Sequence, residues 1–163
     1  MASKRRPLDA GGRSVVASNR RARYDYDILD TYEAGIVLQG SEVKSLRSAK
    51  AQLKDSYAYV SAGEAWLKGV HIVPYSHSSG FGAHEAERER KLLLHRSEID
   101  ELRRRIETDH LTLVPLSLYF LDGRAKVELG LARGRKRHDK RHAIAERDMR
   151  RDVDRAVASR RVR

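Results

Sequence analysis

The fold is decided by one stretch, Thr31-Tyr32-Glu33-Ala34-Gly35-Ile36-Val37-Leu38-Gln39-Gly40-Ser41-Glu42-Val43-Lys44-Ser45-Leu46-Arg47. Its first half alternates apolar and polar residues, which predicts a strand whose even-numbered side chains, from 32 to 38, face a core. A turn is expected at Gly40, and Ser41 is the predicted N-cap of a short helix. A strand that passes through a glycine turn into one short helix suits a small barrel, in which the helix plugs an open end.

Three charged residues lie around this junction between strand and helix. Glu33 precedes the glycine turn, whereas Glu42 and Lys44 lie in the expected helix. Charged side chains are rarely buried, so exposure to solvent is the simplest expectation for each of them. For Glu33, support of the barrel rim and contact with a ligand are equally weighted alternatives.

Alternating apolar residues predict most of the remaining strands. These strands cover residues 24–28, 54–62, 65–72, 111–121 and 124–132. A bulge is expected near Leu29-Asp30, and a bulge or an edge position at Pro115, because each interrupts the alternation. Asp122-Gly123 predicts a hairpin turn.

Two further helices are expected between the strands. Across residues 83–95, glutamates alternate with basic residues at spacings that would support helical ion pairs. Ser97 would cap a second helix, whose apolar face includes Ile99, Leu102 and Ile106. The pattern indicates a mainly β fold with short helices, and periodicity alone allows a barrel or a sandwich.

Length and composition restrict the class of protein. The chain has 163 residues, which fits one domain with tails, and its hydrophobic content of 40% allows a modest core. It has no cysteine, which excludes disulfides and thiolate metal sites. No apolar run approaches the ~20 residues of a membrane helix, and no secretory signal pattern is present. A cytoplasmic location is therefore expected.

The net charge of +11 is concentrated at the two ends. Residues 1–24 contain seven Lys or Arg against one Asp, and residues 133–163 contain thirteen against five acidic residues. Residues 25–132 are mildly acidic, with fourteen basic and seventeen acidic residues. Cationic ends favour a polyanionic partner such as RNA, DNA or a membrane surface. The membrane is less favoured, because the tail lacks the bulky apolar face of an interfacial helix.

We expect three parts. Residues 1–18 mix Lys, Arg, Gly, Ser and Pro without a period, which predicts a flexible basic arm. Residues 19–132 form the folded body. Residues 133–163 form a basic tail that is disordered when free. Its Met149, Val153 and Val157 recur every four residues, too few to fold an isolated helix but enough for one that forms on a partner.

The sequence offers no convincing catalytic site, metal site or cofactor motif. Four histidines, at 71, 77, 84 and 95, lie five or more residues apart and do not have the spacing of paired ligands on a helix. An RNA-cleaving or RNA-modifying enzyme is therefore less favoured than a binding protein. The few aromatic residues lie mostly at core positions, which favours recognition of a folded RNA by shape and backbone.

Four ordered blocks resemble the SsrA-binding protein family, small protein B or SmpB, the partner of transfer-messenger RNA (tmRNA) in bacterial trans-translation. They are Glu33-Ala34-Gly35 with Leu38-Gln39-Gly40 and Glu42-Val43-Lys44-Ser45-Leu46-Arg47, then Lys54-Asp55-Ser56-Tyr57, Arg90-Lys91-Leu92-Leu93-Leu94-His95, and Gly123-Arg124-Ala125-Lys126-Val127-Glu128. The resemblance implies a small antiparallel barrel of the oligonucleotide-binding (OB) type that grips the tRNA-like domain of tmRNA. It also implies a tail that enters the mRNA channel beside the decoding centre and becomes helical there.

The resemblance also implies site residues. Family contacts match Asn19, Glu33 and Leu93, although Leu93 suits an ordinary core position better. The other predicted RNA-binding residues are Arg20, Arg21, Arg23, Lys44, Arg90, Lys91, Arg124 and Lys126. The predicted ribosome-binding residues are Arg135, Lys136, Arg137, His138, Asp139, Lys140 and Arg141.

Two positions depart from the family pattern. Family members usually have a proline, after Asn or Asp, shortly before the block that begins at Arg90, whereas residues 83–88 contain none, which predicts a more helical approach to the block. His138 stands where family tails often carry an aromatic residue, and its charge varies with pH. The implied function is a non-enzymatic RNA-binding adaptor that brings tmRNA to stalled ribosomes, with no cofactor. A general tRNA- or rRNA-binding barrel protein and a DNA-binding architectural protein are the alternatives.

Overall fold

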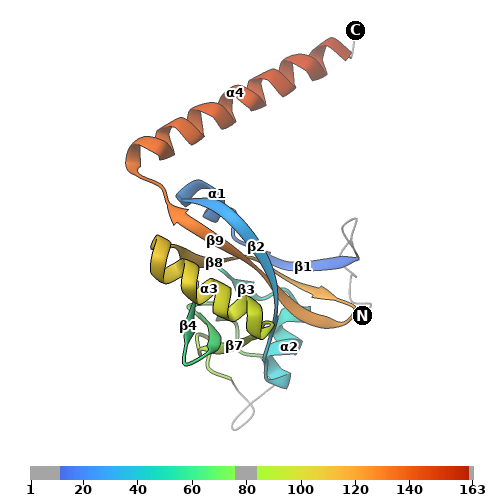
Figure 1. Cartoon of the computed structure of the whole chain (residues 1–163). Coiled ribbons are helices and arrows are strands. Elements are labelled where there is room, and N and C mark those ends of the chain that lie inside the picture. Colours follow the sequence, from blue (N-terminus) through green and yellow to red (C-terminus); the bar gives the residue numbers. More distant parts are fainter. Residues whose placement is uncertain (1–11, 76–83, 162–163) are drawn as a thin grey trace, which may run out of the picture.

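The computed structural model describes residues 12–75 and 84–161. Its elements are β1 (Arg13–Ser18), α1 (Ala22–Asp25), β2 (Tyr26–Ile36), α2 (Gly40–Arg47), β3 (Ala51–Gln52), β4 (Tyr57–Ser61), β5 (Glu64–Lys68), β6 (His71–Ile72), β7 (Arg90–Leu93), α3 (Arg96–Asp109), β8 (Thr112–Leu121), β9 (Arg124–Gly134) and α4 (Arg137–Arg161). Figure 1 shows a body of strands with short helices around it and α4 extending away. The predicted mainly β class with short helices is confirmed.

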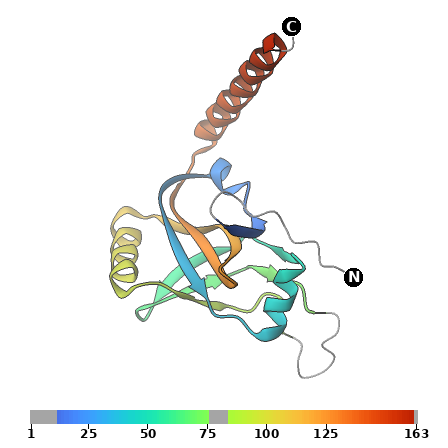
Figure 2. The same cartoon turned by 90° about the vertical axis from the view of Figure 1, so that its right-hand side faces the viewer.

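One antiparallel sheet forms the body. Its strands follow the order β1-β8-β4-β5-β7-β2-β9, and β8 also pairs with β9. This additional pairing closes β8, β4, β5, β7, β2 and β9 into a ring, with β1 attached to the outside of β8 (Figures 1 and 2). A sheet that closes on itself leaves few strand edges unpaired. The short strands β3 and β6 pair separately.

An apolar core fills the interior of this ring. In β9, Val127, Leu129 and Leu131 are fully buried, as the alternation of residues 124–132 predicted. Leu46 of α2 and Leu102 of α3 belong to the same buried cluster. Burial of a leucine side chain contributes about 1.5–3 kcal/mol, so each of these leucines anchors its helix to the core.

The predicted irregularities in the strands are present. The register between β2 and β9 shifts between Ile28 and Asp30, and the register between β8 and β9 shifts beside Pro115. Asp122 and Gly123 join β8 to β9 with φ angles of 50° and 76°. Positive φ at both central residues is typical of a type I′ hairpin turn.

The helix predicted across residues 83–95 is wrong. Among the residues described there, 84–89 form no helix and Arg90–Leu93 form β7, which joins β5 to β2 in the ring. Arg90 and Leu92 are buried, whereas Leu93 is exposed, so burial follows the two-residue period of a strand. The two-residue period was not recognised in the sequence, because Arg90 is a charged residue at a position that faces the core.

The expected N-terminal arm also differs from the structure. β1 lies within residues 1–18 and pairs with β8, and its Val16 side chain is buried. The strand expected from residue 24 begins at Tyr26, because residues 22–25 form the short helix α1. Residues 1–11 lie outside the described part of the chain. The sheet therefore begins earlier than the sequence predicted.

Two helix caps differ from those predicted. Gln39 precedes α2 as its N-cap and His95 precedes α3, instead of Ser41 and Ser97. In both helices, the glutamate at the third helical position returns to the backbone N–H of the N-cap, over 2.8 Å in α2 and 2.9 Å in α3. This reciprocal cap does not need serine or threonine at the first position.

The tail that was expected to be disordered when free is the helix α4, and the sheet continues to Gly134 before it. The chain contains neither glycine nor proline after that residue, and alanine and arginine are frequent there. These residue types favour helix without a packed apolar face. Met149, Val153 and Val157 are exposed along α4, so the stripe noted in the sequence has no cover from the described part of the body.

Candidate nucleic-acid interface

A carboxylate surrounded by cations occupies the outer face of the sheet. Glu33 of β2 accepts hydrogen bonds from the Tyr119 hydroxyl and from Nζ of Lys126, the latter over 2.6 Å. Arg13 of β1 lies 3.6 Å from the same carboxylate and 4.6 Å above the Tyr119 ring. Three strands, β1, β8 and β9, thus supply the groups that fix the Glu33 side chain.

Electrostatics keep this carboxylate ionised. The hydrogen bond from Lys126, followed by the one from Tyr119, lowers the pKa of Glu33 below its usual value. Burial and the bond to Glu33 raise the pKa of Tyr119, so its hydroxyl remains a donor. Arg13 and Lys126 flank the Glu33 carboxylate, and Glu128 faces it across the pairing of β2 with β9. The two cations can contact phosphates, while an oxygen of Glu33 can accept from a base amino group.

Leu93 lies beside this cluster on the same outer face. Gly35 is paired with Leu93 on one side and with Lys126 on the other. The Leu93 side chain is 54% exposed, so the ordinary core position expected for it is wrong. A Cβ on Gly35 would lie 3.2 Å from the Cβ of Leu93, which shows that Gly35 leaves room for it. The structure therefore brings Glu33, Lys126 and Leu93 together around Gly35.

Further cations lie near the same end of the β8–β9 hairpin. Arg124 is exposed beside the turn, and Arg47 of α2 lies 6.0 Å above the Phe120 ring. Lys44, also on α2, is exposed and lies 5.6 Å from the centre of the Tyr75 ring. Lys91 is half-buried and pairs with Glu64 over 2.5 Å. Arg124, Arg47 and Lys44 present positive charge to a ligand, whereas the charge of Lys91 is balanced by Glu64.

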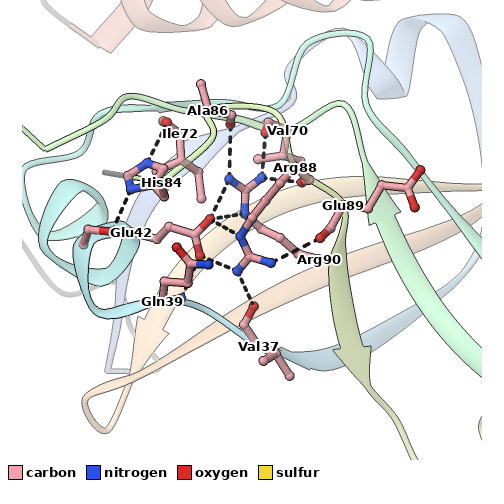
Figure 3. Close-up of polar contacts among 11 residues, drawn as sticks. Val37, Gln39, Glu42, Val70, Ile72, His84, Ala86, Arg88, Glu89 and Arg90 are labelled. Carbon is pink, nitrogen blue, oxygen red and sulfur yellow. Dashed lines mark hydrogen bonds and ion pairs between the residues drawn. The ribbon is translucent and has the colours of Figure 1, made fainter. Parts of the chain in front are cut away.

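Arg90 is not available to a ligand, which corrects its predicted RNA-binding role. The side chain is fully buried and donates from Nε to Glu42 over 2.8 Å (Figure 3). Its other nitrogens donate to the backbone carbonyls of Val70, Ala86 and Arg88. A buried arginine is tolerated because its donors are satisfied within the protein. Arg90 therefore has a structural role.

Glu42 is likewise buried, contrary to the solvated position expected for it. Arg88 donates to both of its oxygens, at 2.8 and 2.6 Å. Burial alone would raise the pKa of Glu42, but hydrogen bonds from Arg88, the Gln39 backbone and Arg90 outweigh it and lower the pKa. Beside this network, His84 bonds to Ser41 Oγ at 2.9 Å. Figure 3 shows that the contacts join α2 to the chain before β7.

Asn19 is used within the fold. Its Nδ2 donates to the carbonyl of Pro115 at 3.2 Å, and its Oδ1 accepts from the backbone N–H of Ala22 at the same distance. This residue therefore ties the start of α1 to the bulge in β8. The neighbouring Arg20, Arg21 and Arg23 are exposed, and Arg21 forms an ion pair with Asp25 at 3.4 Å.

The predicted ribosome-binding residues extend from the end of β9 into α4. Arg135 is half-buried, and its backbone N–H donates to the carbonyl of Asp25 at 3.1 Å. Lys136 and Arg141 are exposed. Arg137, His138, Asp139 and Lys140 belong to α4, but their side chains lie outside the described part of the structure.

Within the described ranges, no group of three or more His, Asp or Glu side chains could hold a metal ion. None of the described helices is both long enough and apolar enough to cross a membrane.

Three contributors to the site were missed in the sequence: Arg13, Tyr119 and Arg88. Arg13 was assigned to a flexible arm, and Tyr119 lies 86 residues from the carboxylate it contacts. Arg88 was read as part of a helix surface. The alternation of residues 117–121 offered one signal, because it places Tyr119 on the face opposite Leu118.

A closed antiparallel sheet with a cationic outer face and a long basic helix is typical of a small β protein that binds nucleic acid. Comparison with known proteins gives a narrower assignment. Residues 16–159 match the model of the SmpB protein family. The chain belongs to the SmpB protein family.

Individual relatives agree with this assignment. The chain is 57% identical to the SsrA-binding protein of Frankia casuarinae over 149 residues, covering 91% of this chain and 93% of the relative. It is 55% identical to the SsrA-binding protein of Kineococcus radiotolerans, covering 93% of this chain and 97% of the relative. A solved structure described as "tmRNA-SmpB: a journey to the center of the bacterial ribosome" contains a similar chain. The TM-score is 0.62 at 48% identity, covering 78% of this chain and 92% of that one.

Proposed function

We propose that this protein binds the tRNA-like domain of tmRNA and brings it to stalled ribosomes, where the incomplete product is tagged and the ribosome is released. The observation that carries the proposal is the 57% identity to an SsrA-binding protein across nearly the full length of both chains. That similarity includes both the sheet and the basic C-terminal region. The similar solved chain is described in the context of tmRNA and the bacterial ribosome.

Within this role, the outer face around Glu33, Lys126 and Leu93 is the proposed contact with the tRNA-like RNA. It combines an exposed apolar side chain with cations and a hydrogen-bond acceptor. Such a surface can read the shape and backbone of a folded RNA and make few base contacts. Lys44, Lys91 and Arg124 would add phosphate contacts near it, and Arg20, Arg21 and Arg23, which lie before the opposite end of β2, would add others there.

The tail is the proposed contact with the ribosome. Residues 135–141 would bind ribosomal RNA near the decoding centre, and α4 would follow the mRNA channel. Action on ribosomes implies a cytoplasmic location. We expect a binding role without catalysis, and incubation of labelled RNA with the protein and magnesium would reveal cleavage or modification if that expectation is wrong.

The proposal is tested by comparing the affinities for three RNAs: the tRNA-like domain, a generic duplex and a single strand. Preference for the tRNA-like RNA supports the adaptor role. Equal affinity for any structured RNA would favour the alternative of a general tRNA- or rRNA-binding protein. Tagging of stalled nascent chains by tmRNA in a translation system that lacks its own SmpB would then test delivery directly.

A further inference from the structure

A cleft lined by arginines lies where α4 leaves the body. α4 contacts α1 at this point, and Figure 1 shows the start of the helix beside α1. The cleft has a volume of about 610 Å³. Its arginines come from the α1 region (Arg20 and Arg23), the segment after β9 (Arg135) and α4 (Arg147 and Arg150). Residues far apart in the sequence thus contribute cations to one hollow.

These five guanidinium groups are not neutralised within the described part of the protein. None of them forms an ion pair with another described residue, whereas the nearby Arg21 pairs with Asp25. Glu128 and Glu146 also line the cleft, and Glu128 accepts a hydrogen bond from the Ser117 hydroxyl at 3.0 Å. Five cations against two carboxylates leave an excess of positive charge, and a concave wall concentrates its field.

The lining favours a phosphate backbone over a protein partner. Apart from the arginines and glutamates, it consists of Ser18, Asn19, Tyr24, Leu116, Ser117 and Ala143. Leu116 is buried and Tyr24 is half-buried, so the exposed lining is mostly charged or polar, whereas the core of a protein interface is depleted of charged residues. Arginine forks match phosphate oxygens, and several in one hollow can hold successive phosphates of one strand.

We propose that this cleft binds the phosphate backbone of an RNA strand and that the bound strand joins the body to α4. The inference rests on the proposed RNA-binding function and assigns Arg147 and Arg150 a role beyond the tail segment 135–141. Without a ligand, like charges on α1 and α4 face each other and repel. Phosphates between them would replace repulsion with attraction on both sides. RNA binding would therefore hold α4 in its direction relative to the sheet.

The test uses two double variants of the full chain. Arg147→Gln with Arg150→Gln removes two cations from the cleft, whereas Arg151→Gln with Arg155→Gln removes two from the same helix outside it. Glutamine favours helix nearly as well as arginine, so α4 should persist in both, as circular dichroism can check. The probe is an RNA hairpin without a tRNA-like fold, titrated at several salt concentrations.

We expect the cleft variant to bind the hairpin more weakly and to lower the magnitude of the slope of log affinity against log salt by about 1.4–1.8, as loss of two phosphate contacts implies. The control variant should change the slope far less. Equal losses in the two variants, or no loss in the cleft variant, would overturn the inference. Binding of the tRNA-like RNA by the wild type is measured in parallel. If the wild type fails to bind the tRNA-like RNA, the proposed function is contradicted. If the cleft variant keeps the wild-type salt slope for the hairpin, only the proposed role of the cleft is contradicted.

Discussion

Arg90 of β7 donates from Nε to Oε1 of Glu42 on α2 over 2.8 Å, and both side chains are completely buried. Arg88 reaches the same carboxylate from the partly exposed side. A buried ion pair is tolerated only where the remaining donors and acceptors are satisfied, and here backbone carbonyls accept the other donors of Arg90. The pair thus fixes α2, which carries Lys44 and Arg47, against the strand that carries Leu93.

Replacement of Glu42 should therefore destabilise the protein strongly. Glu42→Gln leaves the Arg90 guanidinium buried without its counter-charge, which costs about 3 kcal/mol. Urea unfolding followed by circular dichroism would measure the loss. The matched control is Glu64→Gln, which breaks the more exposed pair with Lys91. That change should cost under about 1 kcal/mol. Similar losses for the two variants would contradict the structural role of the buried pair.

The same carboxylate should contribute to acid unfolding. Folding lowers the pKa of Glu42 below its ordinary 4.5, so the folded state favours the ionised form. The resulting stability is fully present above about pH 4.5 and is lost as the pH falls through the lower, folded-state pKa. Glu42→Gln should accordingly lose less stability than the wild type between neutral and acidic pH. Parallel curves of unfolding free energy against pH for the two proteins would contradict this.

Much of the sheet could be predicted from alternation alone. Residues 124–132 have inward-facing aliphatic residues at every second position, and β9 has that pattern buried. The prediction failed at β7, because an inward-facing arginine has the appearance of a surface residue. Arg90 can face the core only because Glu42, 48 residues earlier, receives it. A local pattern contains no information about that partner.

The candidate site was predicted in part, and through the family resemblance. That resemblance indicated Glu33 and Leu93, which the structure places on one outer face. It did not indicate Arg13 or Tyr119, which orient the Glu33 carboxylate. Their positions depend on the pairing of β1 with β8 and of β8 with β9, which periodicity does not specify. Closure of the sheet is thus the physical step that assembles the site.

Leu93 should contribute to RNA binding and little to stability. Because its side chain is 54% exposed, Leu93→Ala should change the free energy of unfolding by less than about 1 kcal/mol. Its loss from the proposed interface should weaken binding of the tRNA-like RNA severalfold. The neighbouring Leu92→Ala provides the contrast, because Leu92 is buried and its truncation should cost about 2–5 kcal/mol. Gel shifts and unfolding curves of both variants would test the assignment, and unchanged RNA affinity of Leu93→Ala would contradict it.

Glu33 should act as a specific contact, which charge arithmetic alone would not predict. Glu33→Ala should weaken binding of the tRNA-like RNA, because Lys126 and Arg13 lose the carboxylate that positions them. Glu33→Arg should not improve binding, although it adds positive charge. Asp27→Ala is a suitable control, since Asp27 is an exposed carboxylate on the same strand. Fluorescence anisotropy with labelled RNA would measure all three. Tighter binding by Glu33→Arg would show that Glu33 acts only through repulsion of phosphates.

Removal of the tail should separate RNA binding from action on the ribosome. The sheet continues past Ala132, since Gly134 pairs with Tyr26 and the Arg135 backbone bonds to Asp25. Truncation is therefore best placed after Lys136, so that the closed sheet and its outer face remain intact. This fragment should melt cooperatively and retain most of its affinity for the tRNA-like RNA.

The truncated protein should nevertheless fail to support tagging on stalled ribosomes. α4 buries no part of the main core, yet the segment from 133 onward carries thirteen basic residues against five acidic ones, which suits ribosomal RNA. Substitution of Asp139, Lys140 and Arg141 should resemble truncation if that segment is recognised specifically. A tail of the same composition in scrambled order is the decisive control. It keeps the charge but moves Arg147, Arg150 and the exposed residues Met149, Val153 and Val157 away from their places on α4. If the scrambled tail supports normal tagging, the tail acts only as an electrostatic tether. A sequence-specific role would require each side chain at its own position, and scrambling would then abolish tagging.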